Sequence, residues 1–295
     1  GWIKGANSSA LAPERDMGSD GEIGTARALV GRDALAYTLG YFSGDYTQVD
    51  GTASKQIELL PTSLMESSGP SLYNGNIRLM QIDNQAFSTH GYVYNYDQLH
   101  RIKELQTFEN PDVSGTYSWQ GSNQAAGYGM TASYDPNGNI TALTRRGATA
   151  GLLDDFTYTY EAGTNRLDRV EDQVAAGFSS LDVDSQGADN YGYDDSGNLI
   201  RDDQSGVTDI DWLPTGKVDR ITMTSNRLTR FGYGPDQSRW MKYHRDAGGA
   251  EQRTFYVRDA QGNTLATYAY DPVNRTLHWN EQTLYGSDRL GVFRP

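Results

Sequence analysis

The sequence predicts an all-β protein built from antiparallel β-hairpins, and three observations favour this class. A short turn phrase recurs with variations, aromatic residues alternate along the chain before its copies, and Gly and Tyr are abundant, at 33 and 20 of 295 residues. Apolar residues at the i, i+3, i+4 spacing of a helix are hard to find over any useful length. Nearly the whole chain is therefore expected to be strand and turn.

The turn phrase begins with Tyr-Asp in its clearest form and ends with Gly-Asn and an aliphatic residue. Its best copies are Tyr134-Asp135-Pro136-Asn137-Gly138-Asn139-Ile140, Tyr193-Asp194-Asp195-Ser196-Gly197-Asn198-Leu199 and the longer Tyr256-Val257-Arg258-Asp259-Ala260-Gln261-Gly262-Asn263-Thr264-Leu265. Looser copies are Tyr96-Asp97-Gln98-Leu99-His100-Arg101-Ile102, Tyr160-Glu161-Ala162-Gly163-Thr164-Asn165-Arg166-Leu167 and Tyr233-Gly234-Pro235-Asp236. A phrase that returns at intervals of tens of residues indicates an array of supersecondary units.

Each copy has the physical features of a hairpin. Tyr92, Tyr94 and Tyr96 illustrate the alternation before the turn, which places successive aromatic side chains on one face of a strand. Asp can bond its own backbone two residues on, and Gly and Asn tolerate positive φ, so the next residues predict a turn. An aliphatic residue then resumes the alternation. In particular, Gly138, Gly197 and Gly262 are expected at or beside a residue with positive φ.

Along the chain, residues 1–90 carry degenerate units, and residues 91–295 carry the clear hairpins. Residues 111–128 are rich in Gly, Ser and Gln and predict a long hairpin connection. The stretch 171–190 is also irregular. One more hairpin, around Trp212 and Lys217, fills the interval between two copies of the phrase. No change of composition marks a domain boundary, so a single continuous segment is expected.

The bulk composition excludes several classes of function. The formal net charge of −13 disfavours binding to phosphate backbones, so nucleic acid is not an expected partner. The absence of Cys excludes disulfides and thiolate metal sites. No apolar stretch reaches the roughly 20 residues needed to span a bilayer. The chain starts at Gly1 without a signal peptide and ends after a repeat-like strand, so it is expected to be part of a longer chain.

Candidates for chemistry all have a simpler structural interpretation. Asp135, Asp194 and Asp259 resemble calcium-loop residues, but the EF-hand spacing is missing, so a turn-forming role is favoured. The four histidines lack zinc spacing, and no nucleophile elbow or phosphate-binding glycine loop occurs. Asp154 and Asp155 are adjacent and would point to opposite faces of a strand. The sequence therefore predicts no catalytic residue, no metal and no cofactor.

The strand-Tyr-Asp-x-x-Gly-Asn-Leu unit resembles the YD repeat of the RHS proteins, a family that includes bacterial polymorphic toxins, the shell component of Tc toxins and the teneurins. Segments outside the hairpins resemble RHS sequence of the kind found in Bacteroidetes. They are Gly1-Trp2-Ile3-Lys4-Gly5, Leu39-Gly40-Tyr41, Leu72-Tyr73-Asn74-Gly75-Asn76-Ile77 and Leu284-Tyr285-Gly286-Ser287-Asp288-Arg289-Leu290-Gly291. The family's self-cleavage phrase is matched only in part, by Asp288-Arg289-Leu290-Gly291, so self-cleavage is not expected of this chain.

The resemblance implies a fold and a function. The fold is a spiralling antiparallel β-hairpin solenoid, a fragment of a larger shell. The function is structural: a secreted or cell-surface shell that encloses and shields a C-terminal effector or toxin for delivery, with no enzymatic activity. The implied partners are the remainder of the shell, the enclosed effector, and secretion machinery or a cell-surface ligand. The alternative is an adhesin or recognition module that binds glycan or protein through its β-sheet.

The residues expected to matter are therefore structural repeat positions. They are Tyr96, Asp97, Tyr134, Asp135, Gly138, Asn139, Tyr160, Tyr193, Asp194, Gly197, Asn198, Tyr233, Tyr256, Asp259, Gly262 and Asn263. The tyrosines are expected to pack against apolar side chains of a neighbouring hairpin and to keep their hydroxyl groups hydrogen-bonded. A sugar-binding platform is the alternative for these rings, and their regular place before each turn favours the packing role.

Overall fold

The computed structural model describes residues 2–7, 28–29, 31, 33–46, 71–84, 86–109, 119, 124–149, 151–175 and 183–295. Every regular element within these ranges is a β-strand, and the strands pair antiparallel with their neighbours in the chain. The predicted all-β class and the predicted hairpin arrangement are thus confirmed.

The first sheet has nine strands among the described residues, in chain order. Their bounds are β1 Gly5–Ala6, β2 Leu35–Gly40, β3 Leu79–Asn84, β4 Phe87–Tyr96, β5 Ile102–Glu109, β6 Gln124–Tyr134, β7 Ile140–Arg146, β8 Leu152–Tyr160 and β9 Leu167–Asp172. The predicted connection over 111–128 is wrong at its end, because β6 begins at Gln124 and extends the hairpin there. Most of the remaining connection lies outside the described residues.

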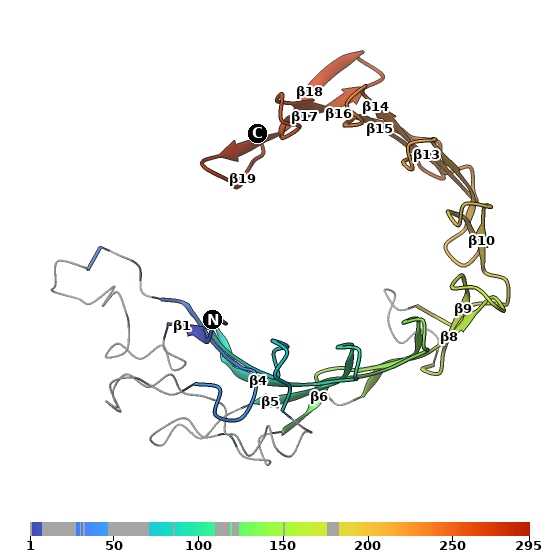
Figure 1. Cartoon of the computed structure of the whole chain (residues 1–295). Coiled ribbons are helices and arrows are strands. Elements are labelled where there is room, and N and C mark those ends of the chain that lie inside the picture. Colours follow the sequence, from blue (N-terminus) through green and yellow to red (C-terminus); the bar gives the residue numbers. More distant parts are fainter. Residues whose placement is uncertain are drawn as a thin grey trace. The chain divides into compact units, whose positions relative to one another are not determined.

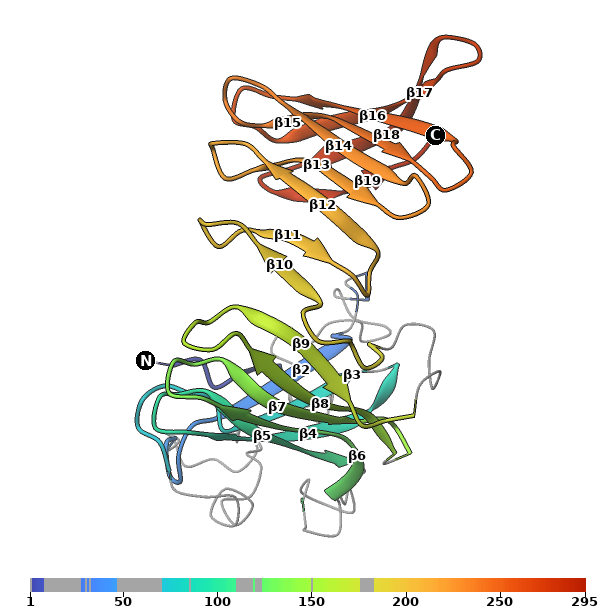
Figure 2. The same cartoon turned by 90° about the vertical axis from the view of Figure 1, so that its right-hand side faces the viewer.

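The second sheet has ten strands, also in chain order, and Figure 1 shows them edge-on as a single layer. Their bounds are β10 Tyr191–Tyr193, β11 Leu199–Asp202, β12 Val207–Trp212, β13 Val218–Met223, β14 Leu228–Tyr233, β15 Arg239–Arg245, β16 Glu251–Arg258, β17 Thr264–Asp271, β18 Thr276–Tyr285 and β19 Arg289–Phe293. Figure 2 shows these strands following one another across the sheet. The hairpin predicted around Trp212 and Lys217 is β12–β13.

The described chain divides into two compact units. The first unit comprises residues 1–158 and 171–185, and the second unit comprises residues 159–170 and 186–295. The division thus falls within the β8–β9 hairpin. The expected change near residue 90, from degenerate to regular copies of the turn phrase, concerns sequence regularity and stays a prediction.

The first unit has the more deeply buried core. Leu79, Val93, Phe108 and Trp119 form a cluster in which each residue is at most 3% exposed. In the second unit most strand residues are only half-buried. A sheet with little covering leaves much surface per residue, which explains the low hydrophobic content of 37%.

A recurrent irregularity in strand pairing stands beside seven of the turns. The register of strand pairing shifts at Tyr96, Tyr134, Tyr193, Tyr233 and Tyr285, and also at Trp212 and Arg258. Such β-bulges turn a side chain away from the regular alternation. In each case the extra residue is the second residue of the strand that follows the turn, such as Ile200 on β11 and Leu265 on β17.

Candidate functional site

The Asp of the turn phrase is bonded within its own turn. In the first clear copy, Asn139 donates its backbone N–H to Asp135 Oδ1 at 2.9 Å and its amide to Asp135 Oδ2 at 2.8 Å. The same two bonds join Asn198 to Asp194 and Asn263 to Asp259, at 2.8–2.9 Å. In each of these turns the Asp carboxylate therefore accepts two hydrogen bonds from the Asn four residues later, one from its backbone and one from its side chain.

The glycine between them has the backbone conformation that the sequence predicts. The φ values are +97° at Gly138, +86° at Gly197 and +90° at Gly262. Each glycine also donates its N–H to the carbonyl of the turn Asp, at 3.0–3.1 Å. This is a three-residue hairpin loop in which a type I turn is followed by a left-handed residue. The predicted glycine turns are confirmed at all three positions.

These bonds change the acidity of the turn aspartates. The hydrogen bond from the Asn198 side chain, followed by that from its backbone, lowers the pKa of Asp194 below the usual 3.8. The side-chain amide of Asn263 lowers the pKa of Asp259 in the same way, against a smaller opposing effect of desolvation. Hydrogen bonds to the ionised form favour it. The turns are thus built around carboxylates.

The looser copies keep this geometry with other residues. At the turn of Asp97, Arg101 replaces the Asn and donates its Nε to Asp97 Oδ2 at 2.6 Å. His100 replaces the Gly at a φ of +65°. In the copy that follows Tyr160, Glu161 replaces the Asp and its N–H bonds the carbonyl of Arg166. A basic residue can therefore take the place of the closing Asn.

The tyrosine hydroxyl before the turn joins consecutive hairpins. Tyr134 donates to the carbonyl of Ile102 at 2.7 Å, and Ile102 is the first residue after the preceding turn. The same bond runs from Tyr96 to Ile77, from Tyr193 to Leu167, from Tyr233 to Val218 and from Tyr285 to Thr264, at 2.7–3.1 Å. We call the residue that makes this bond the donor position. The expectation of bonded hydroxyls is confirmed at these tyrosines.

Tyrosine is not required at the donor position. Trp212 donates its indole N–H to the carbonyl of Leu199 at 2.8 Å, and Arg258 donates its Nε to the carbonyl of Arg239 at 3.1 Å. In its copy of the phrase Tyr256 does not take the donor position, which falls to Arg258, the last residue of β16 before the turn. Tyr256 lies two residues earlier, and its ring faces the guanidinium groups of Arg239 at 4.9 Å and Arg258 at 5.7 Å.

Cations on the rings add a second connection between turns, which the sequence did not predict. The Arg101 guanidinium lies 4.6 Å from the centre of the Tyr134 ring and donates to the carbonyl of Asp135 at 2.9 Å. Arg166 makes the same pair of contacts with Tyr193 and Asp194, at 5.7 and 2.9 Å. Lys217 lies over the Tyr233 ring at 5.6 Å. Tyr134, Tyr193 and Tyr233 thus contact cations, and the packing of the repeat tyrosines against apolar neighbours stays a prediction.

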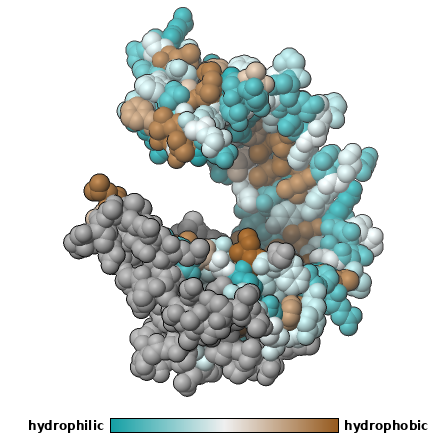
Figure 3. Space-filling view, turned by 60° about the vertical axis from the view of Figure 1, so that its left-hand side comes forward, coloured by the Kyte–Doolittle hydropathy of each residue, from teal (hydrophilic) through white to brown (hydrophobic). Residues whose placement is uncertain are grey.

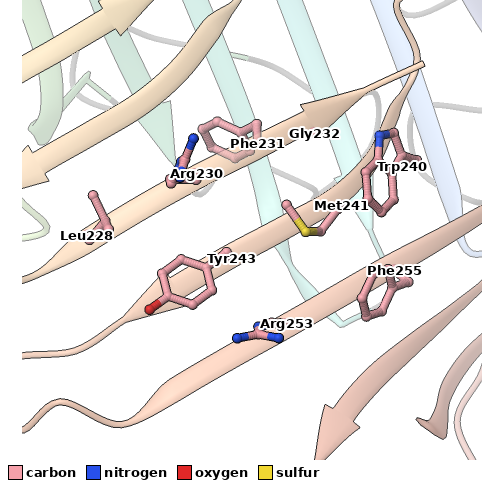
Figure 4. A pocket seen from close by; sticks show the side chains of 9 residues that line it. All are labelled: Leu228, Arg230, Phe231, Gly232, Trp240, Met241, Tyr243, Arg253 and Phe255. Atoms are coloured by element: carbon pink, nitrogen blue, oxygen red, sulfur yellow. The ribbon is translucent and has the colours of Figure 1, made fainter. Parts of the chain in front are cut away.

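A different arrangement occupies the middle of β14, β15 and β16. Strand register sets Arg230, Tyr243 and Arg253 side by side across these strands, and two residues further along it sets Gly232, Met241 and Phe255 side by side. We call these the basic row and the apolar row. They line a groove of about 660 Å³, and Figure 4 shows both rows within it. Apolar side chains are gathered in patches on the face drawn in Figure 3.

Trp240 belongs to the apolar row because of a bulge. Tyr233 pairs with Arg239 and Gly232 pairs with Met241, so Trp240 is the extra residue of β15. Its indole lies against Gly232, where a Cβ atom would come within 3.0 Å of the ring. It also stacks on Phe255, with ring centres 6.0 Å apart, and stays 47% exposed. Sequence analysis missed this groove, although the period-two pattern of Arg253 and Phe255 was a usable signal.

The basic row has one cation without a partner. Arg253 contacts Glu251 at 3.2 Å, and Arg220, the next residue in the row on β13, contacts Asp211 at 2.5 Å. Tyr243 donates to Glu251 at 2.8 Å, and this bond raises the pKa of its hydroxyl. Within the described part of the chain, no hydrogen bond or ion pair engages Arg230, which stands between Arg220 and Tyr243.

Other candidates from the sequence have structural surroundings. Asp154 is 2% exposed and forms an ion pair with Arg145, while its neighbour Asp155 is only half-buried. Among the described residues, no three His, Asp or Glu side chains are grouped as a metal site would require. The search of the same residues for a helix long and apolar enough to cross a membrane finds none.

Comparison with known proteins gives limited similarities of structure. No protein-family model matches the chain, and a search of the curated proteins finds no match. The chain is similar to a crystal structure of TcdB2-TccC3-Cdc42, with 11% identity over 86% of this chain and 12% of that chain and a TM-score of 0.40. A crystal structure of TcdB2-TccC3 has 10% identity over 85% and 12%, with a TM-score of 0.36. A Photorhabdus luminescens Tc holotoxin pore has 11% identity over 85% and 18%, with a TM-score of 0.21. This chain thus spans less than a fifth of these much longer chains.

Proposed function

We propose that this chain is a wall segment of an RHS-type shell that encloses a polypeptide effector. The observation that supports this most directly is the bond from each donor position to the carbonyl after the preceding turn. Tyr134, Tyr193, Trp212, Tyr233 and Arg258 all make it. Because it repeats from hairpin to hairpin, it ties a long sheet together along its turns, as a wall requires.

The proposal includes the absence of catalysis. The polar groups of the turn phrase serve the sheet: Asp135, Asp194 and Asp259 accept from their own turns, and the tyrosine hydroxyl groups donate to the preceding hairpin. The lowered pKa values of Asp194 and Asp259 also make these carboxylates weak general bases at neutral pH. This engagement supports a mechanical role for the repeat residues.

The partners and location follow from the same proposal. The chain would contact the remainder of its own shell and an enclosed C-terminal effector, and it would act outside the cell or at its surface. The formal net charge of −13 supports the exclusion of nucleic acid from this list.

Protection from proteolysis tests the shell. In the natural full-length protein that contains this chain, the C-terminal region should resist a protease that digests the same region when it is produced alone. Replacing Gly138 and Gly197 by Val should remove the protection, because Val is strained at their positive φ values of +97° and +86°. Equal digestion of the C-terminal region with and without the shell would overturn the proposal.

The second candidate function is a recognition module, which the exposed groove favours. Trp240 is 47% exposed beside Phe255, and aromatic residues are enriched at binding surfaces. The sequence that follows this chain in its natural gene discriminates between the functions. A variable effector domain supports the shell, and an anchor or sorting domain supports the recognition module.

A further inference from the structure

Cationic hydrogen-bond donors predominate among the side chains that line the groove on β14–β16, and the one hydroxyl oxygen there, that of Tyr243, is the main acceptor. Arg230 and Arg253 carry guanidinium groups, Trp240 carries an indole N–H, and the Tyr243 hydroxyl is committed to Glu251. Sugar hydroxyl groups both donate and accept, and a glycan site usually supplies both kinds of partner. A lining dominated by cationic donors on an apolar floor instead suits a carboxylate attached to an apolar group.

Local charge points to the same ligand. Residues 228–258 carry six Lys and Arg against three Asp and Glu, within a chain whose net charge is −13. Arg220 and Arg230 stand directly opposite each other on paired strands. Like charges in such positions destabilise a sheet. A bound carboxylate would relieve this repulsion at Arg230, which has no partner within the described residues.

The spacing of the two rows selects a particular backbone. Arg230 and Gly232, Tyr243 and Met241, and Arg253 and Phe255 are each two residues apart on one strand, so the rows are about 7 Å apart. In an extended peptide, side chains at i and i+2 point to one face with the same separation. A peptide lying along the strands can therefore place one side chain in each row.

We propose that this groove binds an extended acidic peptide segment in which an apolar residue and a carboxylate stand two positions apart. The apolar side chain packs on Met241, Phe255 and the Trp240 indole. The carboxylate pairs with Arg230, in a charge-assisted hydrogen bond. This inference goes beyond the shell function and does not depend on it.

Two peptides of one composition test the spacing. Both are serine-rich nonapeptides with one phenylalanine and one glutamate, which are two positions apart in the first and adjacent in the second. Binding to the 295-residue chain, purified as a monodisperse fraction, is measured by isothermal titration. We expect the first peptide to bind about tenfold more tightly, since the second presents its two side chains to opposite faces. Replacing its glutamate by glutamine should cost a similar factor.

Matched variants test the site. Arg230→Gln should weaken binding of the first peptide about tenfold. Lys242→Gln removes the same charge from an exposed residue between Met241 and Tyr243, which points to the other face of β15, and should leave binding unchanged. Trp240→Ala should weaken the first peptide and its glutamine version by the same factor.

Three outcomes would overturn the proposal. They are equal binding of the two peptides, unchanged binding by the Arg230→Gln variant, and binding of a neutral oligosaccharide such as cellohexaose in place of the peptides. The last outcome would assign the groove to glycan recognition. Thermal unfolding of Arg230→Gln is the control for folding, and its temperature should be equal to that of the unchanged chain or slightly higher, because Arg230 is exposed, bonds no other described residue and stands opposite Arg220.

Discussion

At the scale of single residues, the turn phrase contains two kinds of interaction. The bonds between Asp194 and Asn198 lie within one turn and form as soon as that turn forms. The bond from the Tyr193 hydroxyl to Leu167 exists only when a neighbouring hairpin is in place. The first kind specifies where the chain reverses, and the second kind adds each hairpin to the sheet.

The glycine of the turn is required for its backbone. Gly197 has a φ of +86°, and a Cβ atom there would meet nothing within 4 Å, so only backbone strain opposes a side chain. We expect Gly197→Ala to lower the free energy of unfolding by about 1 kcal/mol, and Gly197→Asn to cost less. Gly291→Ala, at a strand position that is equally open, is the control and should not destabilise the chain. Urea denaturation measures all three, and equal midpoints would refute the strain argument.

The hydroxyl at the donor position can be removed without changing the ring. Tyr134→Phe leaves the Ile102 carbonyl without this donor, and we expect a loss of about 1 kcal/mol in the free energy of unfolding. Tyr73→Phe is the matched control, since Tyr73 is 72% exposed and no hydrogen bond of its hydroxyl is found among the described residues. If both variants lose the same stability, the bond between hairpins contributes nothing.

The lowered pKa values of the turn aspartates predict sensitivity to acid. Asp194 and Asp259 titrate below 3.8 in the folded chain, mainly because of the Asn198 and Asn263 side chains. Their contribution to stability is therefore complete above the unfolded pKa of about 3.9 and is lost as the pH falls through the folded values. The urea midpoint should fall below about pH 4, and Asp194→Asn should reduce that fall. A midpoint that is constant down to about pH 3 would contradict this.

At the scale of elements, consecutive hairpins are joined by contacts in which one cationic side chain meets both a tyrosine ring and a backbone carbonyl of the next turn. Arg166 contacts both the Tyr193 ring and the Asp194 carbonyl, so one side chain from the β8–β9 turn meets two groups of the next turn. This geometry fixes the distance between consecutive turns.

A double-mutant cycle measures this connection. We expect Arg166→Met and Tyr193→Leu to be coupled by about 0.5–1 kcal/mol in the free energy of unfolding, because each removes one partner of the cation–ring contact. The control cycle pairs Arg166→Met with Trp279→Leu, which lies on β18, and should be additive. Additivity in both cycles would show that the contact has no energetic weight.

The strands and turns could be predicted from the sequence more fully than the contacts that their side chains make. The Asp, Gly and Asn of each turn interact within a few residues, so the sequence alone predicted turns such as the one at Gly138, and Tyr193 could be assigned to a strand end. Arg258 could not be recognised as a donor, because its bond to the Arg239 carbonyl depends on a neighbouring hairpin and Arg is not the usual residue at this position. The place of Trp240 in the groove could not be predicted either, since its bulge moves it out of the period-two alternation.

At the scale of the whole molecule, charge is unevenly distributed along the chain. The residues of the first unit include 21 Asp and Glu against 10 Lys and Arg, whereas those of the second unit include 17 against 15. The acidic excess of the chain therefore belongs mainly to its first unit. The second unit, which contains the basic row, is close to neutral.

This balance makes a prediction about nucleic acid. Neither unit has an excess of cations, so we expect no binding of duplex DNA or RNA at physiological salt, and none that strengthens steeply as salt is lowered. Fluorescence anisotropy with labelled duplexes is the measurement, with a basic DNA-binding protein as the positive control. Salt-dependent binding would require a concentrated cationic surface and would contradict the expectation.

The donor position has a consequence for how such chains can diverge. Its requirement is a long side chain that ends in an N–H or O–H group, and Tyr134, Trp212 and Arg258 meet it with three unrelated chemical structures. A repeat can therefore lose its characteristic residues, one substitution at a time, while the hydrogen bond that joins it to the neighbouring repeat is kept. Alignment by residue identity would register such a chain as unrelated, whereas alignment by chemical function at each turn would recover every unit.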